Sequence, residues 1–324
     1  MGLGVGEQHL RAYLAAGCRL ARVYDLDRDR AHAAIARYGQ GRAADSFGAV
    51  LSDPMVQVVS IASFDDDHAA QVVAALEAGK HVFVEKPLCR TFEELDRIRR
   101  AWQKSGKALA SNLVLRSAPL YGWLRGRIAQ GRFGKIYAFD GDYLFGRIEK
   151  ITEGWRKDVD DYSVMQGGGI HLVDLMLGLT GEHPNRVTSI GNRICTQETP
   201  FRYNDFMAST FHFESGLVGR ITANFGCVHR HQHVVRIFGT KAAFIYDDAG
   251  ARLHASRDPK AESERPAYAP LPEHKGVRIP AFVEAIAAGR DTRAETEHEF
   301  DVIRACLAAD TALAKGSAVE IAYA

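Results

Sequence analysis

The chain of 324 residues is long enough for one large or two ordinary domains, and its 41 Lys and Arg balance its 40 Asp and Glu. This near-neutral charge, without a basic stripe or a run of like charges, argues against a nucleic-acid partner and a charged tail. With 46% hydrophobic and 25% charged residues, and no apolar run of the roughly 18 residues that span a bilayer, the sequence predicts a soluble globular protein without a membrane partner. The cysteines, Cys18, Cys89, Cys195, Cys227 and Cys306, are odd in number and irregularly spaced, which favours reduced thiols and a cytoplasmic location.

Residues 1–112 alternate between helical and strand-like patterns. This alternation predicts βαβ units and a doubly wound parallel sheet, a Rossmann-type dinucleotide-binding domain. Helices are expected at 7–17, 27–39, 68–80 and 92–106, and strands at 18–27, 56–63, 81–87 and 107–112.

In residues 113–324 helices and strands no longer alternate regularly. Their pattern predicts an α+β domain with an open, mostly antiparallel sheet. Helices are expected at 117–131, 166–181, 279–289 and 299–316, the last two packing back on the body, and strands at 135–146, 185–194, 205–216, 217–228 and 233–248. Residues 255–275 are expected to form a surface loop. An uncovered sheet face predicts a homodimer or homotetramer through residues of about 185–250.

The chain opens with a G-x-G-x-G run formed by Gly2, Gly4 and Gly6. Asp25 ends the next predicted strand, at the offset of about 20 residues where an acid hydrogen-bonds a ribose hydroxyl. An acid there would repel a 2′-phosphate, which favours NAD, although nearby Arg28 leaves NADP open. The alternative is that Asp25 caps the following helix.

A phosphate-binding glycine turn normally follows a β-strand, and Met1 leaves no room for one. We therefore expect the sequence as written to lack the first strand of this domain. In-frame codons upstream should encode a short apolar strand of about five to eight residues.

The stretch AGKHVFVEKPLCRT, an apolar strand that ends in Glu-Lys-Pro, resembles the signature of the glucose–fructose oxidoreductase and inositol dehydrogenase family, Gfo/Idh/MocA. The likeness covers essentially the whole chain and also includes His9 after the glycine turn, SIASFDDDH, SNLVLRSAPLY, GRFGKIY, GWRKD, GGGIHLVDL and FVEAIAAGRD. It implies a Rossmann domain, a second domain with an open sheet, and oxidation or reduction of a carbinol or carbonyl on sugars or cyclitols with NAD or NADP.

The resemblance also implies roles for individual residues. Lys86 matches the lysine near the nicotinamide and the reacting oxygen, and Pro87 fixes the turn that presents it, with a cis bond as one form. His171 matches the general acid/base. The cofactor contacts implied are Gly2, Gly4, Gly6, Asp25, Ser63, His68, Glu85, Lys86 and Asn112, and the substrate contacts are Lys86, Trp155, Arg156, Asp158, Tyr162, His171 and Asp174.

The family often carries an aspartate four residues before the histidine, where this chain has Gly167. We expect Asp158, Asp161 or Tyr162 to supply the missing group. Each of these residues could instead have no role in binding or catalysis. Lys86 would then be an exposed lysine at the end of a strand, His171 a structural histidine, and Trp155 a buried residue of a surface loop.

His229, His231 and His233 alternate along a predicted strand and should project from one face. No acid lies at ligand spacing, so we expect a wall of the pocket or a subunit contact rather than a metal site. Two other functions stay open by resemblance: a glycosidase that uses NAD transiently, and a non-catalytic sugar sensor. Lys86 and His171 argue against the sensor.

Overall fold

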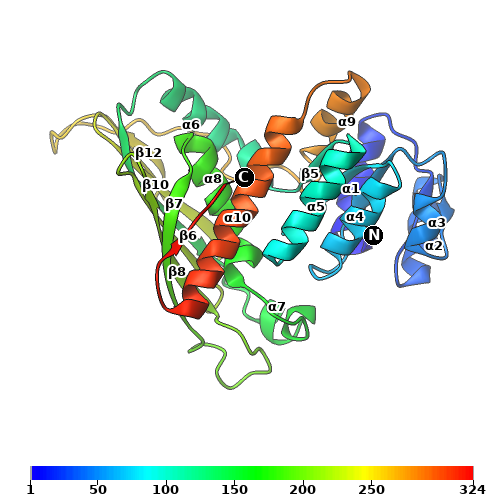
Figure 1. Ribbon diagram of the computed structural model, residues 1–324. Coiled ribbons are helices and arrows are strands. Elements are labelled where there is room, and N and C mark those ends of the chain that lie inside the picture. The colour runs from blue at the N-terminus through cyan, green and yellow to red at the C-terminus, as the bar shows by residue number, and fades with distance from the viewer. Residues whose placement is uncertain (1, 324) are drawn as a thin grey trace. The chain divides into compact units, whose positions relative to one another are not determined.

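The computed structural model describes residues 2–323, which divide into two compact units. Of the described residues, unit 1 comprises 2–117 and 272–300, and unit 2 comprises 118–271 and 301–323. Figure 1 shows the ribbon of both units, coloured by residue number. No helix among residues 2–323 is long and apolar enough to cross a membrane.

Unit 1 alternates strands and helices as the sequence predicts. Its elements are α1 (Leu3–Ala15), β1 (Arg22–Val23), α2 (Arg28–Tyr38), β2 (Arg42–Ala43), α3 (Phe47–Leu51), β3 (Val58–Ile61), α4 (His68–Glu77), β4 (His81–Val84), α5 (Phe92–Ser105), β5 (Leu109–Ser111), the 3₁₀ turn η1 (Val114–Ser117), α9 (Ile279–Ala287) and the start of α10 (Arg293–Lys315). The helix ends follow local chemistry. The side chain of Thr91 caps α5 by accepting from the N–H of Glu94, and Gly106 ends that helix at φ 63°.

The strands of unit 1 are all parallel, which confirms the predicted parallel sheet, but they form two separate pieces. β1 pairs with β2, and β3, β4 and β5 pair in that order. The strand predicted over 18–27 shrinks to Arg22–Val23, because only these residues lie beside β2. A core of Ala12, Phe83, Ala110, Ile279 and Phe282 holds α1 and α9 against β4 and β5.

The glycine run differs from the predicted turn. Helix α1 already begins at Leu3, so Gly4 and Gly6 are helical and only Gly2 is left-handed, at φ 42°. A Cβ on Gly2 would collide with the carbonyl oxygen of Ala62, which follows β3. The residue must therefore be glycine both for its backbone angle and for this close approach.

Unit 2 contains an eight-stranded sheet in the order β12-β11-β10-β6-β9-β8-β7-β13. Only β6 and β9 pair in parallel, which confirms the predicted open, mostly antiparallel sheet. The elements are α6 (Pro119–Ala129), β6 (Ile136–Leu144), α7 (Glu149–Thr152), the 3₁₀ turn η2 (Trp155–Lys157), the π-helical turn η3 (Met165–Gly169), α8 (Ile170–Thr180), β7 (Pro184–Asn192), β8 (Phe206–Phe213), β9 (Val218–Asn224), β10 (Gln232–Gly239), β11 (Ala243–Asp247), β12 (Gly250–His254), β13 (Val319–Glu320) and the rest of α10.

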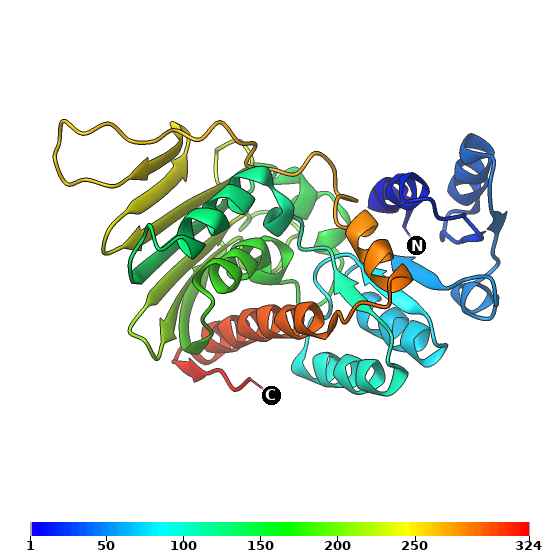
Figure 2. The ribbon, with the colours of Figure 1, turned by 90° about the horizontal axis from the view of Figure 1, so that it is seen from above.

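Helices cover one face of this sheet, as Figures 1 and 2 show for α6 and α8. Alternate residues of the strands, such as Val187 and Phe211, are fully buried on that face. The opposite face carries Ile190, which is 73% exposed. In the described part of the chain, no helix covers this second face.

Candidate active site

The predicted nucleotide residues of unit 1 gather where its parallel strands end. Asp25 follows β1, Ser63 follows β3, Glu85 and Lys86 follow β4, and Asn112 follows β5. Carboxyl ends of parallel strands meet at one edge, and ligands of open α/β sheets bind just outside it. The fold thus collects on one edge residues that are far apart in sequence.

The N-terminus of α1 lies at this edge. Asp25 accepts a hydrogen bond from the N–H of Leu3 at 2.6 Å and one from the N–H of Asp27 at 2.9 Å. Asp25 is therefore a cap, but of α1 rather than of the helix that follows it. A Cβ on Gly4 would meet nothing within 4 Å. The first turn of α1 thus offers exposed backbone and a helix-dipole end suited to a phosphate, so the residues present fit a dinucleotide.

A largely buried hydrogen-bond network supports the segment that carries Lys86. The carboxylate of Glu85 accepts from Asn112 Nδ2 at 2.7 Å and from His9 Nε2 at 2.9 Å. The other ring nitrogen of His9 lies 2.9 Å from the hydroxyl of Ser60, and Asn112 Nδ2 also donates to the carbonyl of Lys275 at 2.8 Å. These bonds tie α1, β3, β4, β5 and the segment before α9 together.

Burial and hydrogen bonding shift the pKa of Glu85 in opposite directions. Burial alone would raise the pKa of its carboxyl, but the hydrogen bond and charge of His9 and the amide of Asn112 outweigh burial and lower the pKa to about 2. The carboxylate is therefore ionised at neutral pH.

Lys86 is half-buried, and its peptide bond to Pro87 is cis. His68 is fully buried beneath this turn. One ring nitrogen of His68 lies 2.7 Å from the carbonyl oxygen of Pro87, and the other lies 3.3 Å from that of Ser63. These contacts let His68 link the turns that follow β3 and β4. The hydroxyl of Ser63 is engaged with Gln71 at 2.9 Å.

In unit 2, three glycines shape the approach to His171. A Cβ on Gly168 would collide with the ring of Tyr143, and one on Gly169 would collide with the sulfur of Met165. The glycines let the π-helical turn η3 pack closely enough for His171 to sit in the first turn of α8. His171 is 8% exposed and lies 6.5 Å from Tyr143, centroid to centroid.

Gly167 stands at the position where the family often has an aspartate, and the space beside it is filled. A Cβ there would collide with the hydroxyl of Tyr162. Arg156 Nε donates to that hydroxyl at 3.1 Å, and the guanidinium of Arg156 lies 4.5 Å from the ring centre of Trp155. Of the three groups expected to replace the aspartate, Tyr162 lies beside position 167.

The remaining predicted residues of unit 2 have other partners. Asp158 is exposed and pairs with Lys157 at 2.8 Å, while the N–H of Asp161 donates to the hydroxyl of Tyr203. Asp174 is 1% exposed. Burial, with smaller contributions from the charges of Asp310 and Asp174, raises the pKa of the Cys306 thiol.

The predicted histidine row is only partly regular. β10 begins at Gln232, so His229 and His231 precede the strand, and His229 pairs with Asp248 at 3.0 Å. His231 and His233 both contact Tyr143, at 5.2 and 5.1 Å between ring centres. Among residues 2–323 no cluster of three or more His, Cys, Asp or Glu could hold a metal ion.

The sequence left His233 open between a wall of the pocket and a subunit contact, and did not indicate that it lies next to His171. Their rings lie 5.9 Å apart. Burial, with the charges of His171 and His231, lowers the pKa of His233 well below its usual range, so this imidazole is neutral. The alternation of strand residues could have placed His233 on the same face as the buried Val235 and Ile237. The pairing of β10 with β6, which brings Tyr143 beside His233, joins segments that are far apart in sequence and could not be seen in a short motif.

Family comparisons match both halves of the chain. Residues 1–113 match the model described as an oxidoreductase family with an NAD-binding Rossmann fold, and residues 121–245 match the model of the GFO/IDH/MocA C-terminal domain.

Several curated proteins are similar in sequence. An uncharacterized oxidoreductase of Rhizobium meliloti is 24% identical over 322 residues, which cover 94% of this chain and 91% of that protein. The 1,5-anhydro-D-fructose reductase of Ensifer adhaerens is 31% identical over 164 residues, 50% of this chain and 47% of the reductase. Levoglucosan dehydrogenase of Pseudarthrobacter phenanthrenivorans is 25% identical over 238 residues, 66% of this chain and 61% of that enzyme. The chain thus matches less than two thirds of the length of these two named enzymes.

Solved structures share the fold. Levoglucosan dehydrogenase in complex with NADH and L-sorbose superposes with a TM-score of 0.86 at 21% identity, covering 100% of this chain and 97% of that one. The myo-inositol 2-dehydrogenase of Lactobacillus plantarum superposes with a TM-score of 0.82 at 18% identity, covering 99% and 98%.

The Glu85 network predicts a specific acid sensitivity. A carboxyl whose pKa falls from 4.5 to about 2 on folding stabilises the protein above pH 4.5 and loses this contribution as the pH falls toward 2. Glu85→Gln should lower the melting temperature at pH 7 and flatten its fall between about pH 5 and pH 2, measured by thermal unfolding across this range. The exposed Glu93→Gln is the control and should follow the parent profile; a Glu85→Gln profile parallel to the parent would contradict the assignment.

Proposed function

On the premise that this chain belongs to the Gfo/Idh/MocA family of oxidoreductases with an NAD-binding Rossmann fold, we propose that it transfers a hydride between a nicotinamide cofactor and a carbinol or carbonyl of a sugar, cyclitol or sugar derivative. The observation that carries the proposal is the Glu85 network, which supports Lys86 at the carboxyl edge of the parallel sheet. The substrate class is supported by the relatives named as levoglucosan dehydrogenase and inositol 2-dehydrogenase.

Unit 1 binds the cofactor in this proposal. Because Gly2 and Gly4 have no side chains, the pyrophosphate can approach the backbone at the start of α1 closely. The Asp25 carboxylate accepts a hydrogen bond from a ribose hydroxyl through lone pairs that its bonds to the N–H groups of Leu3 and Asp27 do not use. The part of the site that binds the nicotinamide is shaped or supported by Ser63, His68, Glu85 and Asn112. When bound, the nicotinamide supplies the hydride acceptor or donor.

Lys86 acts on the reacting oxygen. Its ammonium stabilises the negative charge that develops on this oxygen as the hydride leaves the carbon. The Glu85 network and the contact of His68 with Pro87 fix the backbone on both sides of Lys86, so the cation is positioned before the substrate arrives.

His171 is the acid/base that takes the hydroxyl proton or returns it. Tyr162 stands in for the family aspartate by placing a hydroxyl beside residue 167, with Arg156 holding that hydroxyl in place. Trp155, Arg156, Asp158 and Asp174 complete the substrate contacts, with Trp155 offering a face for a sugar ring. His233, held neutral by burial, packs against His171 without adding charge.

The chain is further proposed to act as a homodimer or homotetramer in the cytoplasm. The exposed Ile190 on the uncovered sheet face supports an interface through residues of about 185–250. The five free cysteines fit a reducing compartment.

A screen of sugars and cyclitols with NAD tests the chemistry. At least one polyol should produce NADH with turnover, and His171→Ala and Lys86→Ala should each cut that turnover by roughly 10²–10⁴. Lys86→Ala should also weaken NAD binding, whereas His171→Ala should leave NAD affinity nearly unchanged.

Exposed residues of the same types serve as controls, and Lys104→Ala and His183→Ala should keep full turnover. A His171→Ala enzyme with most of its turnover would move the base to Lys86 or Tyr162. Cleavage of a glycoside without net NADH would favour the NAD-assisted glycosidase instead.

Asp25 should make NAD bind more tightly than NADP by about 1–3 kcal/mol, through a lost hydrogen bond and charge repulsion of the 2′-phosphate. Asp25→Asn should reduce this preference, measured by calorimetric titration with both cofactors, while the exposed Asp29→Asn should preserve it. Equal affinities in the parent protein would show that Arg28 governs the pocket.

Sedimentation at micromolar concentration should give a dimer or tetramer. Ile190→Asp should shift it toward the monomer, because burying an unpaired carboxylate in an interface is costly. Met55→Asp, exposed in unit 1, should not. A monomeric parent protein would refute the interface.

A further inference from the structure

The turn that precedes His171 is only weakly stabilised by its own sequence. η3 contains Gly167, Gly168 and Gly169, and glycine is among the poorest helix formers. A π-helical turn is also a rare conformation that concentrates at functional sites. His171 is the second residue of α8, which follows η3 directly, so the orientation of its ring depends on this turn. Contacts from outside the turn must therefore fix η3.

The hydroxyl of Ser163 caps the start of η3. It accepts hydrogen bonds from the N–H groups of Met165 at 3.1 Å and Gln166 at 3.2 Å, and the carbonyl of Ser163 accepts from the N–H of Gly167 at 2.8 Å. A serine hydroxyl has two acceptor lone pairs and one proton. Because the two N–H groups use both lone pairs, the proton is what remains for a bond to another side chain.

Asp310 of α10 receives that proton. Ser163 Oγ donates to Asp310 Oδ1 at 2.6 Å, and Gln166 Nε2 donates to Asp310 Oδ2 at 2.7 Å. All three residues belong to unit 2. Hydrogen bonds to an ionised carboxylate are shorter and stronger than those between neutral groups. Each oxygen of this one carboxylate thus holds one side chain at the start of the turn.

The part of α10 that carries Asp310 is firmly packed. Ala309 and Ala312, which flank Asp310, are fully buried. Cys306 lies one helical turn before Asp310, and burial, followed by the charges of Asp310 and of Asp174 in α8, raises the pKa of its thiol. The same stretch of α10 is therefore close to the start of η3 and to the helix that carries His171.

The ionised form of Asp310 is the one that fits both partners. Burial raises the pKa of this carboxyl to about 6, although the bonds from Ser163 and Gln166 lower it, so it is mostly ionised at neutral pH. A neutral acid or amide in its place would carry a hydrogen on one side. Neither the hydroxyl of Ser163, with both lone pairs in use, nor the amide nitrogen of Gln166 could accept that hydrogen.

We propose that Asp310 is a positioning residue for His171: its carboxylate holds Ser163 and Gln166 at the start of η3, and this turn sets the orientation of the His171 ring. Tyr162 precedes Ser163 in the chain, so its place beside Gly167 depends on the same bonds. The expected effect on turnover rests on the proposed function, whereas the effect on the His171 ring does not.

Asp310→Asn tests this role, because it keeps the shape of the side chain and replaces one acceptor by a donor. The matched rescue is the double variant Asp310→Asn with Gln166→Glu, in which the amide and the carboxylate change places and a donor again faces an acceptor. Ser209→Ala is the control, since it removes a buried hydroxyl of β8 that bonds to Ser189 at 2.8 Å and not to η3.

The first measurement uses the full chain without cofactor or substrate, with its histidines labelled with carbon-13. The Cε1–H NMR signal of His171 is assigned by its absence in His171→Ala. Asp310→Asn should shift and broaden this signal, the double variant should restore it, and Ser209→Ala should leave it in place. An unmoved signal in Asp310→Asn, or a double variant that behaves like Asp310→Asn, would overturn the proposal.

The second measurement compares turnover with binding, using the polyol that the screen identifies. Asp310→Asn should lower kcat by roughly tenfold to a hundredfold, because a displaced acid/base loses its alignment with the reacting group. The KM and the NAD affinity should stay within about twofold, and the double variant should recover most of the kcat. Loss of NAD binding together with kcat would overturn a role confined to positioning.

A second pair of variants covers the case in which Asp310→Asn does not fold. Ser163→Ala removes the same bond from the other side and should shift the His171 signal, whereas Ser163→Thr keeps the hydroxyl and should leave the signal near its parent position. Equal signals in these two variants would overturn the proposal. A parent protein that turns over no polyol would count against the proposed function, while the His171 signal still decides the role of Asp310.

Discussion

The largely buried, ionised carboxylate of Glu85 is the constraint on which unit 1 depends. An ionised carboxyl inside a protein costs several kcal/mol unless its lone pairs are satisfied, and here His9 and Asn112 satisfy them. Because these partners come from α1 and from the end of β5, the charge is tolerated only when both elements are in register with β4. The same arrangement fixes the residue that follows, Lys86. Structural order and the position of the proposed catalytic cation therefore have one cause.

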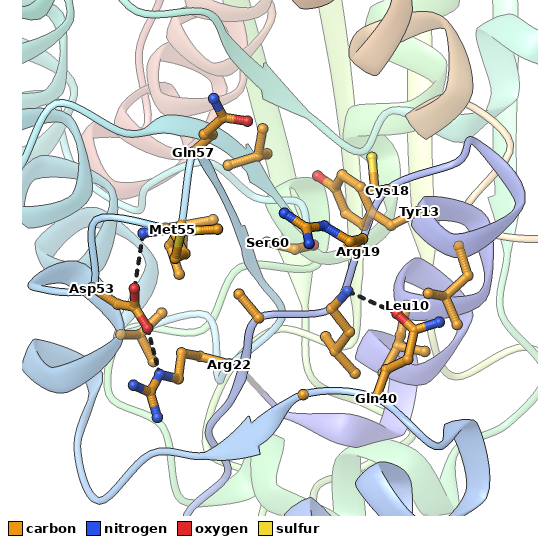
Figure 3. Close-up of a pocket in the computed structure, with 18 of the residues that line it drawn as sticks. Leu10, Tyr13, Cys18, Arg19, Arg22, Gln40, Asp53, Met55, Gln57 and Ser60 are labelled. Atoms are coloured by element: carbon orange, nitrogen blue, oxygen red, sulfur yellow. Dashed lines mark hydrogen bonds and ion pairs between the residues drawn. The ribbon is translucent and has the colours of Figure 1, made fainter.

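The two pieces of the parallel sheet are attached to α1 at different places. The β3–β4–β5 piece is tied to α1 through His9 and Ser60, whereas the β1–β2 piece meets α1 through the bond between Asp25 and Leu3. A cavity is lined by residues of both pieces, among them Val58 and Ser60 of β3 and Arg22 of β1 (Figure 3).

Much of this architecture could be predicted from the sequence, because it depends on local patterns. Apolar runs such as 81–84 predicted the strands, and the helical pattern over 92–106 predicted α5. Features that depend on non-local contacts could not be predicted. The helical start at Leu3 follows from its bond to Asp25. Which of Asp158, Asp161 and Tyr162 lies beside Gly167 depends on the close packing of η3 against Tyr162. The grouping of His171, His233 and Tyr143 depends on the pairing of β6 with β10, which no short motif encodes.

The central claim is that hydride moves directly between a polyol carbon and the nicotinamide. It is tested most directly by isotope transfer, with the polyol that the screen identifies deuterated at its carbinol carbons and the reduced cofactor analysed by mass spectrometry. The account predicts one deuterium in each NADH formed, and none when the polyol is unlabelled and the solvent is D₂O. Reduced cofactor that takes its new hydrogen from solvent, or labelled polyol that is consumed without reducing NAD, would contradict it.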